Sequence, residues 1–137
     1  MIVGITGHRD FDKKKFDITS FLENLLIHDA VQIIAGGAPG FDRHITAICY
    51  YLNFKYCLYL PYPNFFWDKT LFNEALIVKT IDQFAKKDSY KKRNQKIVDD
   101  CDILFCYYDE KNKWASGTGQ TVRMAERKGI NVINFFK

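Results

Sequence analysis

Apolar residues in this chain gather in short, nearly continuous runs. Five such runs lie at residues 2–6, 31–35, 55–60, 103–107 and 131–135. Runs of this length without apolar–polar alternation are typical of parallel strands that are covered on both faces. Between the runs, apolar residues recur every three to four positions, as at Phe21, Leu22 and Leu25. The pattern therefore predicts five buried strands separated by helices.

The helices that connect these strands are predicted with unequal clarity. Periodic segments lie at residues 16–26, 45–52, 71–85, 90–100 and 120–128. Asp10 or Asp12 is available to cap the first helix, and Gly129 is a natural end for the last. The pattern is weakest between residues 62 and 90, where the prediction is a helix over residues 71–85.

Strands that alternate with helices define the fold class. The sequence predicts a single Rossmann-like α/β domain over residues 1–137, with a parallel five-stranded sheet and helices on both faces. Right-handed crossovers favour the strand order 3-2-1-4-5. In such a sheet the ligand site lies beyond the carboxyl ends of the strands, where the order reverses between the first and the fourth strand.

Composition excludes several classes of protein. A chain of 137 residues that is 47% hydrophobic is long enough for one core and too apolar to be disordered. No run approaches the roughly 18 apolar residues of a membrane helix, and no secretory leader is recognisable. Four cysteines lack the spacing of a zinc site, so we expect buried, reduced thiols. The expectation is a cytoplasmic protein without membrane association, bound metal or cofactor.

Loops that follow two of the predicted strands have unusual composition. Residues 7–9 after the first strand are Gly7, His8 and Arg9, and the loop after the second contains Gly36, Gly37, Gly40 and Asp42. Glycines let the backbone approach a ligand, and the helix start that follows favours an anion. Asp42 is suited to accept hydrogen bonds from a ribose. The alternative is that the glycines form a tight turn and Asp42 caps the helix.

The loop after the fourth strand is a third candidate. Ser116, Gly117 and Thr118 open a helix, which places free amides and small hydroxyls where a phosphate can bind. Trp114 is a candidate for stacking on a base. Asp109 and Glu110 are carboxylates available for catalysis.

Positive charge is concentrated in residues 86–96. The segment carries six basic residues and one acid, which makes +5, so the rest of a chain of net charge +4 carries −1. Within it, Arg93 is suited to hold a phosphate and Asn94 to bond a base or ribose. The alternative is a basic helix face in solvent.

Four motifs together resemble one superfamily. GITGHR, IIAGGAPGFDRHITAICYYL, RNQKIVDDCDILF and SGTGQTVRMAERKGINVINF occur in this order. The set resembles the SLOG superfamily, which includes YpsA-like proteins, the Lonely guy phosphoribohydrolases and the core of DNA processing protein A. The resemblance implies nucleotide binding and a homodimer or larger homo-oligomer. In the phosphoribohydrolases an Arg matching Arg93 and a Glu are catalytic, but Thr121 stands at the Glu position here.

Three functions follow as hypotheses. The first is binding of a nucleotide or nucleotide-derived signal, such as an ADP-ribose-like molecule or a nucleoside monophosphate, by a sensor or sequestering module. The second is an N-glycosidase, with Asp109 or Glu110 in place of the missing Glu. The third is single-stranded nucleic-acid binding by the basic segment and the aromatic stretch at residues 54–72. Those rings are equally suited to the core or to self-association.

Overall fold

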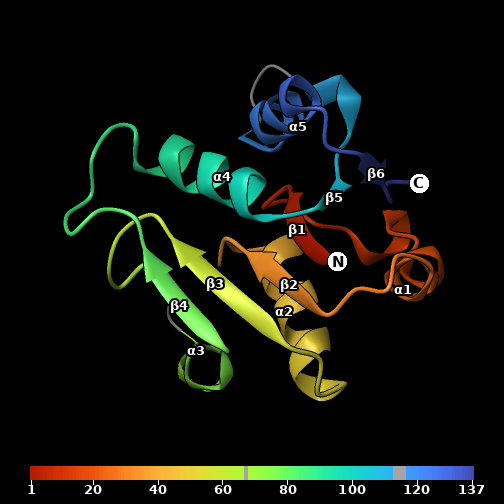
Figure 1. Ribbon diagram of the computed structural model, residues 1–137, viewed down its shortest axis with the longest axis horizontal. Helices are drawn as coiled ribbons and strands as arrows, with labels where there is room; N and C mark the ends of the chain where they lie inside the picture. Colours follow the sequence, from red (N-terminus) through yellow and green to blue (C-terminus); the bar gives the residue numbers. More distant parts are fainter. Residues whose placement is uncertain (67, 113–116) are drawn as a thin grey trace.

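The chain folds into a six-stranded parallel sheet covered by helices on both faces (Figure 1). This computed structural model describes residues 1–66, 68–112 and 117–137. The strands are β1 (Ile2–Gly7), β2 (Gln32–Ala35), β3 (Tyr56–Leu60), β4 (Ile77–Thr80), β5 (Ile103–Tyr107) and β6 (Val132–Asn134). The helices are η1 (Lys13–Lys15), α1 (Ile18–Ile27), α2 (Phe41–Tyr51), α3 (Lys69–Glu74), α4 (Ser89–Asp100), η2 (Glu110–Asn112) and α5 (Gly117–Lys128).

The strand order is β4-β3-β2-β1-β5-β6. The five predicted strands keep the expected relative order, and β1 lies between β2 and β5, so the order reverses where the pattern predicted. The predicted helix over residues 71–85 is wrong. Only α3 is helical there, and β4 follows it as a parallel edge strand paired with β3.

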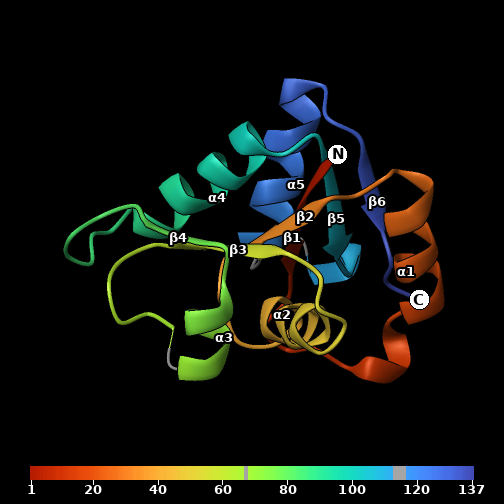
Figure 2. The same cartoon turned by 60° about the horizontal axis from the view of Figure 1, so that its bottom comes forward.

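Alternate side chains of each strand pack on opposite faces of the sheet. In β5, Ile103, Phe105 and Tyr107 join the core beneath α1 and α2, whereas Leu104 and Cys106 pack with α5. Figure 2 shows α1, α2 and α3 on one side of the sheet and α4 and α5 on the other. The three layers explain why the strands are apolar at nearly every position.

The sequence predicted the residue that ends α5 but not the residue that caps α1. Asp17, rather than Asp10 or Asp12, caps α1 by accepting a hydrogen bond from the amide of Ser20 at 3.1 Å. Asp12 instead caps the short η1 helix. Gly129 follows α5 with a φ of 78°, a left-handed conformation that favours glycine at a helix end.

All four cysteines are buried and unpaired. Burial raises the pKa of Cys49 and of Cys106 to about 12, so both thiols stay protonated at neutral pH. Within the described residues, no helix is long and apolar enough to span a membrane.

Candidate functional site

A pocket of about 630 Å³ opens at the carboxyl ends of β1 and β5, where the strand order reverses. It is lined by nine of the residues singled out in the sequence, namely Gly7, His8, Arg9, Asp42, Arg93, Asn94, Asp109, Gly117 and Thr118. The sequence did not single out the other lining residues as ligand contacts; they are Ile5, Thr6, Asp10, Asp12, Lys15, Ala38, Tyr90, Ile97, Tyr107 and Phe136. Loops from three strands therefore meet in one pocket.

The glycines of the β2–α2 turn pack against neighbours and do not line the pocket. A Cβ at Gly36 would lie 2.6 Å from the guanidinium of Arg93. Gly37 and Gly40 have φ values of 73° and 86°. A Cβ at Gly37 would also crowd Phe66. These glycines therefore allow the turn itself and its close packing.

Main-chain amides at and before the start of α2 already donate hydrogen bonds within the protein. The amide of Phe41 donates to the carbonyl of His8 at 3.2 Å, and the amide of Ala38 donates to Asp42 Oδ2 at 3.4 Å. Asp42 lies in the first turn of α2 and does not occupy the cap position, which is Gly40. This helix start therefore offers fewer free amides to an anion than the glycine pattern indicated.

Asp42 is a buried carboxylate at the base of the pocket. Only 6% of the residue is exposed, and its Oδ1 atom has no hydrogen-bond partner within the described part of the chain. Burial raises the pKa of Asp42 to about 6, and the charge of Arg93 opposes that shift. At neutral pH the side chain is therefore mostly an anion, stabilised by the charge of Arg93 and by hydrogen bonds from the main chain at Ala38 and Gly36.

Arg93 is held inside the protein. It is 5% exposed, and its guanidinium donates to the carbonyl of Gly36 at the end of β2 and to the carbonyl of Tyr59 in β3. Its Nε atom donates to Asn94 Oδ1 at 2.7 Å. Arg93 thus connects α4 to β3 and to the residue that follows β2. As a lining residue it also supplies positive charge to the pocket.

Arg9 is the exposed arginine of the pocket. Its guanidinium lies 5.4 Å from the ring centre of Tyr90 and 5.9 Å from that of Phe65, which are cation–π distances. Tyr62 and Tyr90 share a hydrogen bond between their hydroxyls at 3.0 Å. Burial raises the pKa of Tyr90, but hydrogen bonds from Tyr62 and Arg9 leave it below its ordinary value. An isolated tyrosine at the start of a helix gave no sequence signal for this role.

His8 links the loops that follow β1 and β5. The amide of Asp109 donates to His8 Nε2 at 2.9 Å, which requires that nitrogen to be unprotonated. Burial lowers the pKa of His8, although Asp109 and Asp10 act to raise it. The Asp109 carboxylate in turn accepts from the amide of Lys111. His8 and Asp109 together fix one side of the pocket.

Asn94 and the start of α5 form another part of the pocket lining. A Cβ at Gly117 would lie 3.9 Å from Asn94 Nδ2, so the amide of Asn94 faces this helix start. Thr118 is buried in the first turn. Trp114 and Ser116, both predicted to bind the ligand, lie outside the described residues.

Neither Thr121 nor Glu110 lines the pocket. Thr121 is fully buried, and its hydroxyl donates to the carbonyl of Gly117 at 2.9 Å. Glu110 lies in η2 and is exposed. Of the two carboxylates proposed to replace the missing Glu, only Asp109 reaches the pocket.

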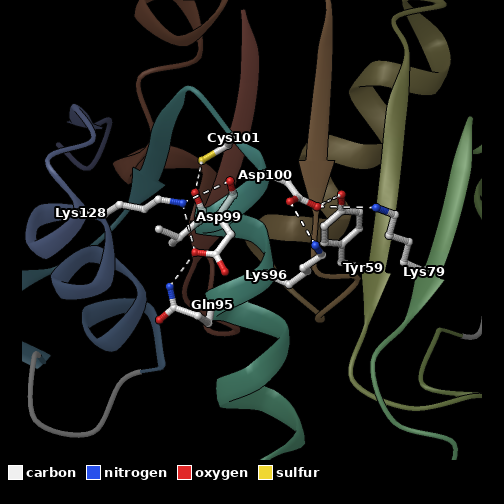
Figure 3. Close-up of polar contacts among 9 residues, drawn as sticks. Tyr59, Lys79, Gln95, Lys96, Asp99, Asp100, Cys101 and Lys128 are labelled. Atoms are coloured by element: carbon white, nitrogen blue, oxygen red, sulfur yellow. Dashed lines mark hydrogen bonds and ion pairs between the residues drawn. The ribbon is translucent and has the colours of Figure 1, made fainter.

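Two adjacent acids anchor the end of α4, the helix that carries Arg93 and Asn94. Figure 3 shows Asp99 and Asp100 pointing in opposite directions. Asp99 pairs with Lys128 of α5 at 3.1 Å, and Asp100 accepts from the hydroxyl of Tyr59 at 2.6 Å. The helix is therefore fixed to both α5 and the sheet.

Much of the positive charge in residues 86–96 is neutralised by the protein itself. Lys92 pairs with Asp82 at 2.7 Å, and Lys96 pairs with Asp100 at 3.3 Å. Arg93 is buried, as described above. Lys87 and Lys91 are exposed and make no ion pair within the described ranges. The segment is therefore less cationic as a surface than its net charge of +5 indicates.

The described rings of the aromatic stretch at residues 54–72 divide between the core and the surroundings of Arg9. Tyr56, Tyr59 and Phe66 are buried. Phe65 packs edge-on against Tyr90 at 5.6 Å, beside Arg9. Phe65 thus lies next to Tyr90 and Arg9, two residues that line the pocket.

This architecture defines a Rossmann-like α/β domain with a pocket at the switch point of its sheet. No protein-family model matches the sequence, and no curated protein matches it. Two solved structures of DNA processing protein A do share the fold. The Helicobacter pylori protein, described for its single-stranded DNA binding mode, has a TM-score of 0.71 and 22% identity. The Streptococcus pneumoniae protein has a TM-score of 0.69 and 17% identity.

The similarity covers nearly all of this chain but only part of each neighbour. It spans 96% of this chain and 63% of the Helicobacter pylori chain, and 95% of this chain and 48% of the Streptococcus pneumoniae chain. At these identities the comparison shows the fold alone. The Rossmann-like fold expected from the resemblance to the SLOG superfamily is confirmed.

Proposed function

We propose that the chain binds a nucleotide or a nucleotide-derived signal in this pocket, as a sensor or sequestering module. The observation that carries the proposal is that one pocket is lined both by Arg9, an exposed arginine, and by Asp42, a buried carboxylate with one oxygen that has no hydrogen-bond partner among the described residues. A ligand that satisfies both needs an anionic group and a hydrogen-bond donor in one small molecule. A nucleotide has a phosphate and a ribose diol.

The phosphate side of the pocket combines three features. Arg9 is exposed to solvent, and Arg93 adds its charge from inside the protein. Gly117 and Thr118 lie at the start of α5, where the helix dipole favours an anion. Asn94 faces that helix start. We assign the phosphate to the space between Arg9, Asn94 and the start of α5.

The ribose side rests on Asp42. Its Oδ1 is buried and has no donor in the part of the chain that the structure describes, and a buried acceptor without a donor costs free energy until a ligand supplies one. A sugar hydroxyl is a donor of suitable size. Because ionised Asp42 is the better acceptor, binding of a diol favours the anion and lowers the pKa of this residue.

Calorimetry with AMP and ADP-ribose tests the proposal. Arg9→Ala is expected to weaken binding about tenfold or more by removing the phosphate contact, and Asp42→Asn to weaken it by a similar factor. Lys91→Ala, which removes an exposed charge of α4 that does not line the pocket, is the matched control. Unchanged affinity in both pocket variants would overturn the assignment. Chromatography of each mixture shows whether the ligand stays intact or loses its base, which is the outcome expected of an N-glycosidase using Asp109.

A second candidate is the end of a single-stranded nucleic acid. Its support is the fold shared with DNA processing protein A, together with Arg9 beside the paired rings of Phe65 and Tyr90. Exposed Lys15 at the pocket lining could extend the contact to a further phosphate. Fluorescence anisotropy with a short oligothymidylate separates the two candidates. Oligonucleotide binding falls steeply with salt and is competed by AMP if both use this pocket.

A further inference from the structure

Tyr90 lies near the start of α4, on the face of the helix that lines the pocket. The lining residues of this helix are Tyr90, Arg93, Asn94 and Ile97. Their spacing of three and four residues places them on one helix face. The start of the helix is held by the hydroxyl of Ser89, which donates to Asp82 at 2.7 Å. The main chain that carries Tyr90 is therefore fixed before a ligand binds.

The ring of Tyr90 is contacted by both arginines of the pocket. The guanidinium of Arg9 lies 5.4 Å from the centre of this ring, and that of Arg93 lies 5.7 Å from it. Both distances are within the range of cation–π contacts. The hydroxyl of Tyr90 also accepts a hydrogen bond from Arg9. Tyr90 thus lies beside the cation to which we assigned the phosphate.

The hydroxyl of Tyr90 shares a second hydrogen bond, with the hydroxyl of Tyr62 at 3.0 Å, in which either oxygen can be the donor. A phenol has one proton to donate, and its direction adapts to the partners present. When Tyr62 donates, the oxygen of Tyr90 accepts from Tyr62 and from Arg9, and the proton of Tyr90 is directed to a third partner. Tyr62 does not line the pocket, so it reaches a ligand only through Tyr90.

We infer that the hydroxyl of Tyr90 donates a hydrogen bond to the phosphate of the ligand, with Tyr62 as a positioning residue for it. Phosphate oxygens are strong acceptors, and the arginines favour an anion at this part of the pocket. When the phosphate binds, Tyr90 turns its proton to the anion and Tyr62 donates to Tyr90, so the bond between the two hydroxyls is kept. The inference rests on the proposed function, since it requires a phosphate in this pocket.

Calorimetry with AMP and with adenosine tests the inference on Tyr→Phe variants, which keep the ring and remove the hydroxyl. Tyr90→Phe is expected to weaken AMP binding about tenfold and to leave adenosine binding unchanged, because adenosine lacks the phosphate. Tyr62→Phe is expected to weaken AMP binding about threefold. The double variant is expected to match Tyr90→Phe, because Tyr62 acts through Tyr90. Tyr51→Phe, which is 83% exposed at the end of α2, is the control that leaves affinity unchanged.

The pKa of Tyr90 gives a second readout, which distinguishes contact with phosphate from a structural role. Ultraviolet absorbance follows the ionisation of tyrosines, and the difference between the original chain and Tyr90→Phe isolates Tyr90. The pKa of Tyr90 is expected to rise when AMP is bound, because an anion that accepts from the hydroxyl stabilises the protonated phenol. A tyrosine distant from the phosphate keeps its pKa. Circular dichroism of each variant shows whether the fold is retained.

The phosphate of a free nucleotide and the phosphate at the end of a nucleic-acid strand present the same acceptor oxygens to Tyr90. Fluorescence anisotropy with a terminally phosphorylated oligothymidylate distinguishes these sources. Weaker binding by Tyr90→Phe of AMP, of the oligonucleotide or of both supports the inference and identifies the source.

Unchanged affinity of Tyr90→Phe for both ligands, or an unchanged pKa with AMP bound, would overturn the inference while the proposed function stands. A double variant weaker than Tyr90→Phe would overturn the role of Tyr62. If the original chain binds neither ligand, the proposed function and the inference both fail.

Discussion

The guanidinium of Arg93 lies directly against Gly36 and donates a hydrogen bond to its carbonyl oxygen. A Cβ at position 36 would lie 2.6 Å from Nη1 of Arg93 and 3.0 Å from Oδ2 of Asp42. Glycine at this position therefore allows the cation of α4 and the anion of α2 to approach the same strand end. Gly36, which directly follows β2, contributes to the pocket by allowing this approach.

Replacement of Gly36 by alanine is expected to destabilise the fold. The methyl group displaces a buried guanidinium whose hydrogen bonds join α4 to β2 and β3, at a cost of about 1–3 kcal/mol in the free energy of unfolding. Urea denaturation measures this change. Gly117→Ala is the matched control, because among the described residues its Cβ meets no atom closer than 3.9 Å. Equal stability of the two variants would contradict the packing role of Gly36.

The titration of Asp42 predicts a pH dependence of stability. Its pKa rises from an ordinary value of 3.8 to about 6 in the folded protein because of burial, opposed by Arg93. The folded state then holds more protons than the unfolded state, so the contribution of Asp42 to stability is greatest below pH 3.8 and is lost as pH rises to 6. The loss is on the order of 3 kcal/mol.

The measurement for Asp42 is a comparison of two pH profiles. The free energy of unfolding of the original chain, minus that of Asp42→Asn, is expected to fall between pH 4 and pH 6 and to be level above pH 7. The pKa values of Asp99 and Asp100 are lowered in the folded state, so their contribution to stability rises with pH. Both residues are present in both proteins, and subtraction removes their contribution. A flat difference would show that Asp42 is ionised with an ordinary pKa.

The hydrogen bond between His8 and the Asp109 amide predicts a second pH effect. The folded pKa of His8 lies below 6.5 because burial disfavours the cation. The bond is therefore complete above pH 6.5 and is lost as pH falls through the lower folded value, together with its contribution to stability. NMR of the Asp109 amide resonance follows the change. His8→Phe, which lacks an acceptor, is expected to show the low-pH resonance position at every pH.

The sequence predicted the layered architecture because it is encoded in local composition. Strands that are apolar on both faces, such as β5, indicate burial without any knowledge of the fold. Strand β4 was not predicted, because its local pattern indicates a helix. Ile77 and Val78 follow a helical periodicity that begins at Leu71, and only pairing with β3 makes the segment a strand. Tertiary context overrode local propensity there.

Site prediction succeeded in placing residues at one edge of the sheet and was less informative about their contacts. His8, Asp42 and Asn94 line the pocket because each follows or faces the end of a strand. Arg93 donates its hydrogen bonds to main-chain carbonyls because of the distances between α4, β2 and β3. A sequence motif does not contain these distances. Whether the lining residues bind a ligand stays a prediction.

The fully buried Thr121 yields a last prediction, about catalysis. Its hydroxyl bonds to the carbonyl of Gly117 inside α5, so a carboxylate introduced there enters the packed interior and not the pocket. Thr121→Glu is therefore expected to lower the free energy of unfolding by roughly 3 kcal/mol or more. It is also expected to release no base from nucleoside monophosphates.

Chromatography of the incubated mixture and urea denaturation check the two parts of this prediction. Gln120→Glu is the control, since this half-buried neighbour lies near the start of the same helix, where the dipole tolerates an acid. Its stability is expected to change by no more than about 0.5 kcal/mol. A stable Thr121→Glu variant that releases base would show that α5 turns this position towards the pocket. In that case a single substitution would separate a nucleotide-binding pocket from a nucleotide-cleaving one.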